Sequence, residues 1–260
     1  MIAGAALLAG AMDVPAQSTA TRLEEGRLHE LQEITVTAQH VASGSGLIRR
    51  EEATRSRTTV GNAYLLTQAP GQSVAQSLNL VPGLNFTNAD AYGASGGNLR
   101  MRSFDGNRIS LMVDGMQLND SGNYAIYTGQ MPDPEIIEMA SVNLGTTDVD
   151  SPTASATGGT INLLMATPHR QPALLLKPSV GSDAYRRAFV RIDSGEFGRW
   201  NTTAFASWSL QQYDKFKGPG ELRRQQFNAR LLQPLGDGDF ISLAAHFNRG
   251  RSHFYRYATA

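Results

Sequence analysis

The stretch from Trp200 to Leu210, WNTTAFASWSL, alternates with a period of two residues. Every second residue, starting at Trp200, is Trp, Thr, Ala, Ala, Trp and Leu, which gives an extended strand one apolar face. Four other segments after residue 171 repeat this pattern, at 174–180, 188–192, 227–231 and 241–247. The alternation predicts five successive antiparallel strands, each with one apolar and one polar face.

Two environments produce such strands. A soluble sheet buries the apolar face, whereas a transmembrane β-barrel turns it toward lipid. The segments run for roughly nine residues or more, which suits a tilted membrane strand better than a soluble strand of about 5–6 residues. On a strand, Trp200 and Trp208 are about 26 Å apart, or about 20 Å in height at a tilt of about 40°. This spacing is typical of two aromatic girdles, so a barrel is favoured over a sandwich.

The composition narrows the class of protein. The chain has 260 residues, with 23 basic and 23 acidic side chains, so no net field favours nucleic acid. It has no cysteine, which excludes disulfides, zinc thiolate sites and cysteine nucleophiles. The histidines lack metal-ligand spacing, and the sequence contains neither a phosphate loop nor a G-x-S-x-G elbow. The sequence therefore predicts no enzyme, metal site or cofactor.

The N-terminal part contains one strand-like island in polar surroundings. Residues 1–16 include a short apolar run that ends in small residues, which predicts the remnant of a signal peptide. Residues 17–56 are polar and charged, which is typical of a tether. Within the tether, Ile34–Thr37 is β-prone and has no partner strand nearby. A lone strand on a tether is suited to pair with the sheet of another protein.

Residues 57–167 predict a compact α+β domain of short elements. Ser73 is a candidate N-cap for a helix that stops at Val81-Pro82-Gly83, and Asp133-Pro134 resembles a second helix start. Asp114-Gly115 predicts a tight turn. Strands are predicted at 84–87, 99–104, 109–113, 140–144 and 160–164.

Four groups of motifs follow one another in the chain: EITVTA at 33–38, SLNLVPG at 77–83, LRMRSFDG at 99–106 with LMVDG at 111–115, and GGTIN at 158–162. In this order they resemble the TonB box, the start of the plug domain, its core and its closing segment in the TonB-dependent outer-membrane receptors of Gram-negative bacteria. Ser103, Leu144 and Thr146 depart from the residues most common in that family. The resemblance places these positions in turns, so it implies that the departures bear on substrate subfamily rather than on fold.

The resemblance implies an α+β plug domain at 57–167, followed at 172–260 by antiparallel transmembrane β-barrel strands of a barrel that is incomplete in this chain. It implies that one set of residues binds TonB: Glu33, Ile34, Thr35, Val36, Thr37 and Ala38. It assigns a second set to the plug core: Arg100, Arg102, Asp114, Gly115, Gly158 and Gly159. Arg100 and Arg102 are expected to alternate on one strand, where they either contact barrel carboxylates or form a solvated strand face.

The implied function is TonB-dependent, energy-coupled uptake of a scarce nutrient, such as an iron–siderophore complex, across the outer membrane. The partners are then TonB with its inner-membrane energising complex, outer-membrane lipid and a small-molecule or metal-chelate ligand. The plug and the N-terminus face the periplasm. Candidate ligand contacts are Tyr92, Asn98, Tyr124 and Tyr127 in two loops, although packing against the barrel wall equally explains the tyrosines. The alternative function is a secreted or periplasmic β-rich binding or adhesion module without transport.

Overall fold

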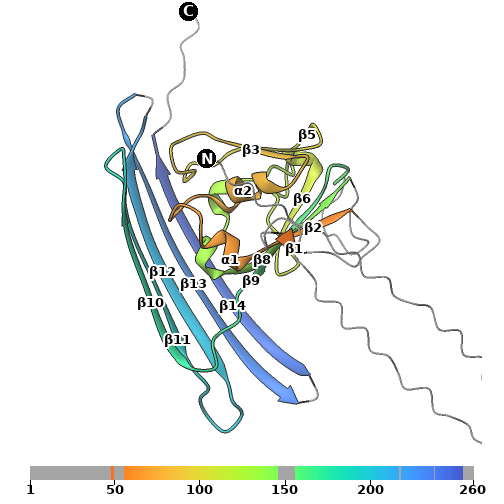
Figure 1. Cartoon of the computed structure of the whole chain (residues 1–260), viewed down its shortest axis with the longest axis vertical. Coiled ribbons are helices and arrows are strands. Elements are labelled where there is room, and N and C mark those ends of the chain that lie inside the picture. The colour runs from red at the N-terminus through yellow and green to blue at the C-terminus, as the bar shows by residue number, and fades with distance from the viewer. Residues whose placement is uncertain (1–47, 50–55, 146–155, 217, 237, 254–260) are drawn as a thin grey trace, which may run out of the picture. The chain divides into compact units, whose positions relative to one another are not determined.

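The structure, a computed structural model, describes residues 48–49, 56–145, 156–216, 218–236 and 238–253. An α+β domain formed by strands β1–β9 precedes a five-stranded antiparallel sheet formed by β10–β14 (Figure 1). No helix in these residues is both long enough and apolar enough to cross a bilayer.

The α+β domain contains two sheets. The larger one has the strand order β1-β2-β8-β9-β6-β7, with β6 and β9 parallel and the other neighbours antiparallel. Its strands are β1 (Ile48–Arg49), β2 (Arg57–Gly61), β6 (Ile109–Val113), β7 (Met116–Gln117), β8 (Ile137–Leu144) and β9 (Gly159–Met165). The smaller sheet contains β3 (Leu84–Asn88), β4 (Gly97–Met101) and β5 (Phe104–Asp105).

The helices of the domain are single turns or little more. They are α1 (Asn62–Leu65), α2 (Val74–Ser77) and the 3-10 turns η1 (Leu78–Leu80), η2 (Gly106–Arg108), η3 (Thr128–Gln130) and η4 (Pro134–Ile136). The predicted helix after Ser73 is present as α2 continued by η1, but Ser73 makes no side-chain capping bond. The predicted strands at 84–87, 109–113, 140–144 and 160–164 are confirmed.

The core of the domain lies around β6, whose sequence ISLMV is buried at all five positions. Leu111 pairs across the sheet with Ile161 of β9, and both side chains are at most 1% exposed. Phe189 and Phe205 from the five-stranded sheet join the same apolar cluster. The two parts of the fold therefore share a small apolar contact in addition to their polar ones.

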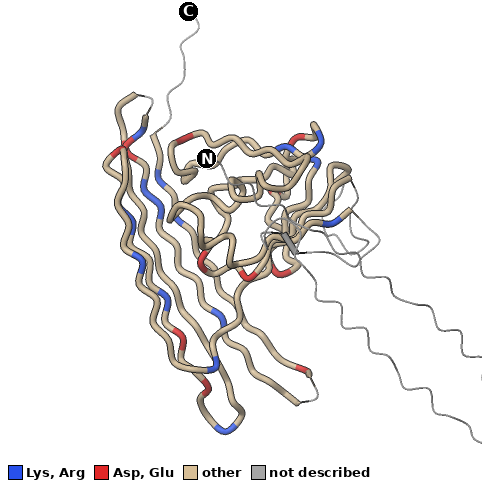
Figure 2. Tube along the Cα trace, viewed as in Figure 1, with Lys and Arg blue, Asp and Glu red and all other residues tan. Residues whose placement is uncertain are grey.

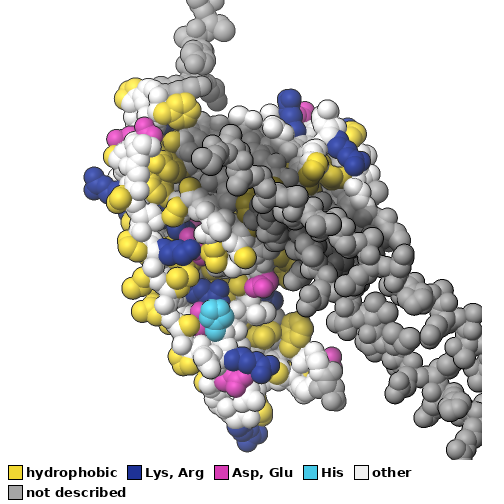
Figure 3. Space-filling model, viewed as in Figure 1, with side chains coloured by type: hydrophobic (Ala, Val, Ile, Leu, Met, Phe, Trp, Pro, Cys, Tyr) yellow, Lys and Arg dark blue, Asp and Glu magenta, His cyan; other side chains and the backbone are white. Residues whose placement is uncertain are grey.

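The five-stranded sheet is a meander of long strands joined in chain order. Its strands are β10 (Pro172–Val180), β11 (Arg186–Ser194), β12 (Thr203–Asp214), β13 (Glu221–Gly236) and β14 (Asp239–Ser252). These confirm the five alternating segments of the sequence. We call the face toward the α+β domain the inner face and the opposite one the outer face. Figure 3 shows hydrophobic side chains along the side of the sheet that is turned away from the domain, which is the outer face.

The predicted spacing of the two tryptophans was wrong. Trp208 lies on the outer face of β12, but Trp200 precedes the strand, in a turn where Gly198 and Asn201 have φ of 70° and 52°. A left-handed residue in this turn reverses the chain, so the distance along an extended strand does not apply. Trp200 is still 63% exposed, with Arg199 stacked over its ring.

Candidate functional site between the domain and the sheet

The inner face of the five-stranded sheet is polar where it meets the α+β domain. The side chains of Ser207, Gln226 and Asn228 are only 2–3% exposed there, whereas Leu174 and Leu243 on the outer face are 62% and 70% exposed. Figure 2 shows basic residues spaced along these strands. A sheet that buries its polar face and exposes its apolar face is the reverse of a soluble sheet, and is typical of membrane β-barrel strands.

Two carboxylates of the domain meet two arginines of the inner face. Arg187 on β11 donates two hydrogen bonds to Glu135, from Nη1 to Oε1 at 2.7 Å and from Nη2 to Oε2 at 2.9 Å. The Nη2 atoms of Arg187 and Arg224 both lie 3.2 Å from Asp133 Oδ1, and Ser209 Oγ donates to Oδ2 at 2.5 Å. All four charged side chains are at most 3% exposed. We call Asp133, Glu135, Arg187 and Arg224 the ion cluster; its charges balance.

Asp133 reaches the ion cluster because it immediately precedes the turn η4. The sequence predicted that Asp133 caps a helix beginning at Pro134, but η4 is one 3-10 turn and Asp133 makes no side-chain capping bond. Its carboxylate accepts bonds from the sheet instead, since bonds to guanidinium are stronger than those to a neutral N–H. On β11, strand alternation places Arg187 on the inner face and leaves Arg186 exposed.

Asp114 joins a second contact to the sheet. The predicted Asp114-Gly115 turn is confirmed, with φ of 48° and 80° at its two residues, and it connects β6 to β7. Asp114 Oδ1 accepts a hydrogen bond from the Met165 amide at 2.9 Å, and Oδ2 lies 3.3 Å from Arg230 Nη1. The Arg230 Nη1 also donates to the Met165 carbonyl at 3.0 Å. The turn thus ties β13 to the end of β9.

Gly158 and Gly159 stand where the backbone of the domain is crowded. A β-carbon on Gly158 would lie 2.9 Å from the Phe104 β-carbon and 3.0 Å from the Arg108 carbonyl oxygen. Gly159 has a φ of 133°, and a β-carbon there would overlap the Asn143 carbonyl oxygen. These glycines allow β9 to begin between β6 and β8.

The prediction that Arg100 and Arg102 alternate on one strand was wrong. The predicted strand 99–104 breaks at Arg102 and Ser103, whose φ values are 48° and 72°, so the two arginines do not alternate on one strand. Arg100 pairs with Asp105 at 3.1 Å on the surface, and the Arg102 side chain is exposed. Ion pairs between the domain and the sheet instead join domain carboxylates to sheet arginines.

Tyr92 packs against the sheet rather than standing free. Its ring stacks on Tyr185 with 3.9 Å between ring centroids and meets Tyr213 edge-on at 5.0 Å. Its hydroxyl oxygen lies 3.1 Å from Ser182 Oγ, in the connection between β10 and β11. The wall-packing alternative therefore describes Tyr92 in this structure.

Asp90 holds the loop that carries Tyr92. Its carboxylate accepts hydrogen bonds from the Tyr213 hydroxyl, from Ser95 Oγ and from the backbone amides of Tyr92, Gly93 and Ser95. Burial by itself raises the pKa of Asp90, but the bonds from Ser95, Tyr213 and the amides outweigh burial and lower this pKa below its ordinary value. Sequence reasoning missed Asp90, although an Asp in a Gly- and Ser-rich loop is a familiar acceptor for backbone amides.

Two of the other three candidate ligand residues border shallow hollows, whereas Tyr124 lines neither of them. Asn98 lines a hollow of about 660 Å³ and Tyr127 lines one of about 330 Å³, and both hollows share Ser95 and Gly97. Tyr127 is 49% exposed, and Tyr124 is 37% exposed with a φ of 57°. The two predicted loops are thus neighbours, but Tyr92 does not line either hollow.

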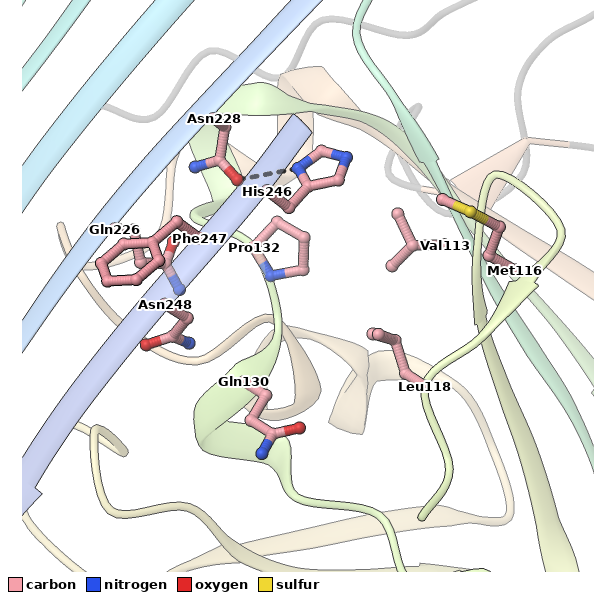
Figure 4. Close-up of a pocket in the computed structure, with 10 residues that line it drawn as sticks. All are labelled: Val113, Met116, Leu118, Gln130, Pro132, Gln226, Asn228, His246, Phe247 and Asn248. Atoms are coloured by element: carbon pink, nitrogen blue, oxygen red, sulfur yellow. Dashed lines mark hydrogen bonds between the residues drawn. The ribbon is translucent and has the colours of Figure 1, made fainter. Parts of the chain in front are cut away.

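A cavity of about 240 Å³ separates the turn at β6–β7 from strands β13 and β14. Figure 4 shows Val113, Met116 and Leu118 on its apolar side, with the polar residues Asn228 and His246 across from them. His246 Nδ1 and Asn228 Oδ1 are 2.9 Å apart. The cavity offers hydrogen bonds on one wall and apolar contact on the other.

Two predicted features lie outside the described residues: the signal remnant at 1–16 and the candidate TonB-binding residues 33–38. Among the residues that are described, no group of three or more His, Asp or Glu side chains has a geometry that could hold a metal ion.

Comparison with known proteins gives a family model and several solved structures. Residues 49–160 match the model described as TonB-dependent Receptor Plug Domain. The pyoverdine outer membrane receptor FpvA of Pseudomonas aeruginosa aligns with 75% of this chain and 28% of its own, at 20% identity and a TM-score of 0.62. The alcaligin receptor FauA of Bordetella pertussis aligns with 78% and 33%, at 18% identity and 0.62.

The copper transporter OprC aligns with 78% of this chain and 31% of its own, at 14% identity and a TM-score of 0.60. A comparison with curated proteins found no match. The chain therefore spans about a quarter to a third of the solved chains whose fold it shares.

Proposed function

We propose, from the premise that residues 49–160 are the plug domain of a TonB-dependent receptor, that the protein takes up a scarce nutrient across a Gram-negative outer membrane. The plug fills the inner face of a barrel to which β10–β14 contribute. Uptake is driven from the periplasmic side through TonB and its inner-membrane complex. This is transport, and it requires no catalytic residue or cofactor of the chain.

One observation carries this proposal: the reversed burial of the five-stranded sheet. Ile192, Leu243 and Phe247 on the outer face are 56–70% exposed, while the ion cluster is buried on the inner face. Exposed apolar area of this extent is unfavourable in water, and lipid removes that cost. The same reversal supports transport over a soluble binding module, because a soluble sheet would bury Leu243 and expose Gln226.

The coupling step is assigned to residues 33–38, EITVTA. An extended segment binds by adding a strand to the sheet of its partner, with backbone hydrogen bonds for affinity and alternate side chains for register. TonB is the partner that the family suggests. Pulling on this strand would reach the plug through the tether that joins it to β2.

The cargo is assigned to the two hollows that share Ser95 and Gly97, with Asn98 and Tyr127 as first contacts. FpvA is a pyoverdine receptor and FauA an alcaligin receptor, PiuA of Acinetobacter baumannii is a siderophore receptor, and OprC is a copper transporter. A metal chelate, in the first place an iron–siderophore complex, is therefore the cargo class to test.

The decisive experiment is Val36→Pro in the protein as the cell makes it. Proline cannot donate a ladder hydrogen bond, so this variant should bind a labelled ferric siderophore from a test panel as the parent does, yet take up almost none. Val36→Ile keeps the donor and is the matched control. Undiminished uptake by Val36→Pro would refute the coupling role, and recovery of the protein in the soluble periplasm would refute the transport function.

A further inference from the structure

On β13 and β14 the outer face of the sheet changes from aromatic to polar and basic side chains within two residues. Cross-strand register aligns Trp208 of β12, Phe227 of β13 and Phe247 of β14 in one row, and their side chains are 41–57% exposed. Two residues further toward the β12–β13 connection, the next row contains Gln225 opposite Arg249. Such a row of aromatics beside polar side chains is typical of the boundary between hydrocarbon and headgroups.

Beyond that row, two arginines occupy directly opposite positions. Arg223 of β13 pairs in register with Arg251 of β14, and both are exposed. Like charges placed opposite each other destabilise a sheet. Together with Gln225 and Arg249, these arginines line a hollow of about 240 Å³.

Within the described residues, these three guanidinium groups have no carboxylate partner. On the inner face the opposite holds, since the arginines there each reach a carboxylate: Arg187 and Arg224 in the ion cluster, Arg191 at Asp193 and Arg230 at Asp114. The carboxylate nearest in sequence on the outer face, Glu221, accepts a hydrogen bond from Gln212 instead. The basic hollow thus has an excess of positive charge and unused donors.

We propose that Arg223, Arg249 and Arg251 bind the phosphate group of an anionic lipid, whose acyl chains lie along the aromatic row and the apolar rows beneath it. Guanidinium groups bind phosphate through paired N–H donors, and a bound dianion would offset the repulsion between Arg223 and Arg251. The aromatic row favours a lipid over free phosphate, because it continues the hollow with apolar surface on which chains can pack. This inference rests on the proposed membrane location of the sheet.

The test uses the full protein as encoded, extracted from membranes in a neutral detergent and titrated by native mass spectrometry. The probes are diphosphorylated lipid A, the same lipid after removal of its phosphates, and inorganic phosphate. The parent should retain diphosphorylated lipid A and bind the other two probes weakly. Arg223→Gln/Arg249→Gln/Arg251→Gln should bind it at least about tenfold more weakly, because several charged hydrogen bonds are lost. Arg199→Gln, at the opposite end of the sheet, is the matched control.

A single variant keeps the test decisive if the triple variant does not fold. Arg251→Gln removes one of the two opposed charges, so in lipid-free detergent it should unfold at a temperature equal to or above that of the parent, and still lose lipid binding. Equal lipid binding by the parent and by Arg251→Gln would overturn the inference, as would equal binding of the dephosphorylated lipid. If inorganic phosphate bound as tightly as the lipid, the hollow would be a site for a free anion and the lipid assignment would be wrong.

The outcome is separable from that of the proposed function. If the protein takes up cargo but these variants bind diphosphorylated lipid A as the parent does, the lipid inference alone fails. Recovery of the protein in the soluble fraction would instead remove the membrane premise.

Discussion

Replacing Arg187 by methionine should loosen the contact between the plug and the sheet more than any surface change nearby. Both oxygens of Glu135 accept their hydrogen bonds from Arg187, so the variant leaves a carboxylate that is 2% exposed without its partner. Asp133 keeps Arg224 and Ser209. Removing one member of a buried ion pair costs about 3–5 kcal/mol, which is a factor of roughly a hundred to a few thousand in an opening equilibrium.

The absence of cysteine from the chain provides the assay. Ser207 is 2% exposed on the inner face of β12, and Ser207→Cys introduces a nearly isosteric thiol that a maleimide reaches when the plug moves away. In the regime where reclosing is fast, the labelling rate follows the population of the open state. Arg187→Met should therefore label about two to three orders of magnitude faster than the Ser207→Cys parent.

Two further variants make the result specific. Arg186→Met removes the same charge from the adjacent residue on the outer face and should leave the labelling rate unchanged. Arg187→Met/Glu135→Met replaces the whole pair by apolar side chains and should recover most of the loss, because the unpaired charge is gone. Labelling of Arg187→Met within about threefold of the parent would refute the account. The account would also be refuted if the labelling rate of the double variant equalled the rate obtained by adding the separate effects of Arg187→Met and Glu135→Met.

Two other predictions concern residues of the α+β domain. Asp90→Asn should lower the free energy of unfolding at pH 7 by about 1.5–3 kcal/mol, because charged hydrogen bonds are lost. The pKa of Asp90 is lowered in the folded state, so the stabilisation by its carboxylate is present above about pH 4 and is lost as the pH falls through the folded-state pKa. Melting curves of the parent and the variant should therefore converge at strongly acidic pH, and a constant difference between them would contradict this assignment. Gly159→Ala should lower the free energy of unfolding by more than about 2 kcal/mol in the same measurement, since the new β-carbon would overlap the Asn143 carbonyl oxygen. At Gly115 a β-carbon would have no atom within 4 Å, so Gly115→Ala should cost only the about 1–2 kcal/mol of a left-handed alanine. Equal losses for the two variants would show that crowding is not the reason for glycine at position 159.

The sequence was most informative where the signal is local. Alternation located β10–β14, and the dipeptide Asp114-Gly115 predicted its turn, because period and turn chemistry depend on neighbouring residues. Alternation is symmetric, however, so it could not say which face of the strands is buried. Segment length and the order of the motifs supplied that choice, and the exposed Leu174 and Leu243 agree with it.

The contacts between distant segments were beyond local patterns. Glu135 and Arg187 are 52 residues apart, and Tyr213 and Asp90 are 123 residues apart. Asp133 had an adequate local explanation as a helix cap, so nothing in its surroundings marked it as a partner for arginine. The strand predicted at 99–104 breaks at Arg102 and Ser103, and because non-glycine residues adopt a positive φ only rarely, the apolar–polar pattern did not predict this break. Because of this break, Arg100 and Arg102 do not alternate on one strand.

The chemistry of the plug–sheet contact bears on how a pulled plug could move. An apolar contact of the same size would resist separation through its buried area, whereas polar side chains exchange partners with water as they part. Beyond the ion cluster, Gln211 and Asn228 bury side-chain atoms without a partner among the described residues, and groups of this kind are normally bridged by ordered water. The contact thus combines a few strong ion pairs with uncharged polar side chains and with the apolar contact of Phe189 and Phe205. Under the proposed coupling through residues 33–38, we expect a pull on the plug to strain first the bonds between Asp133, Glu135 and the arginines of β11 and β13.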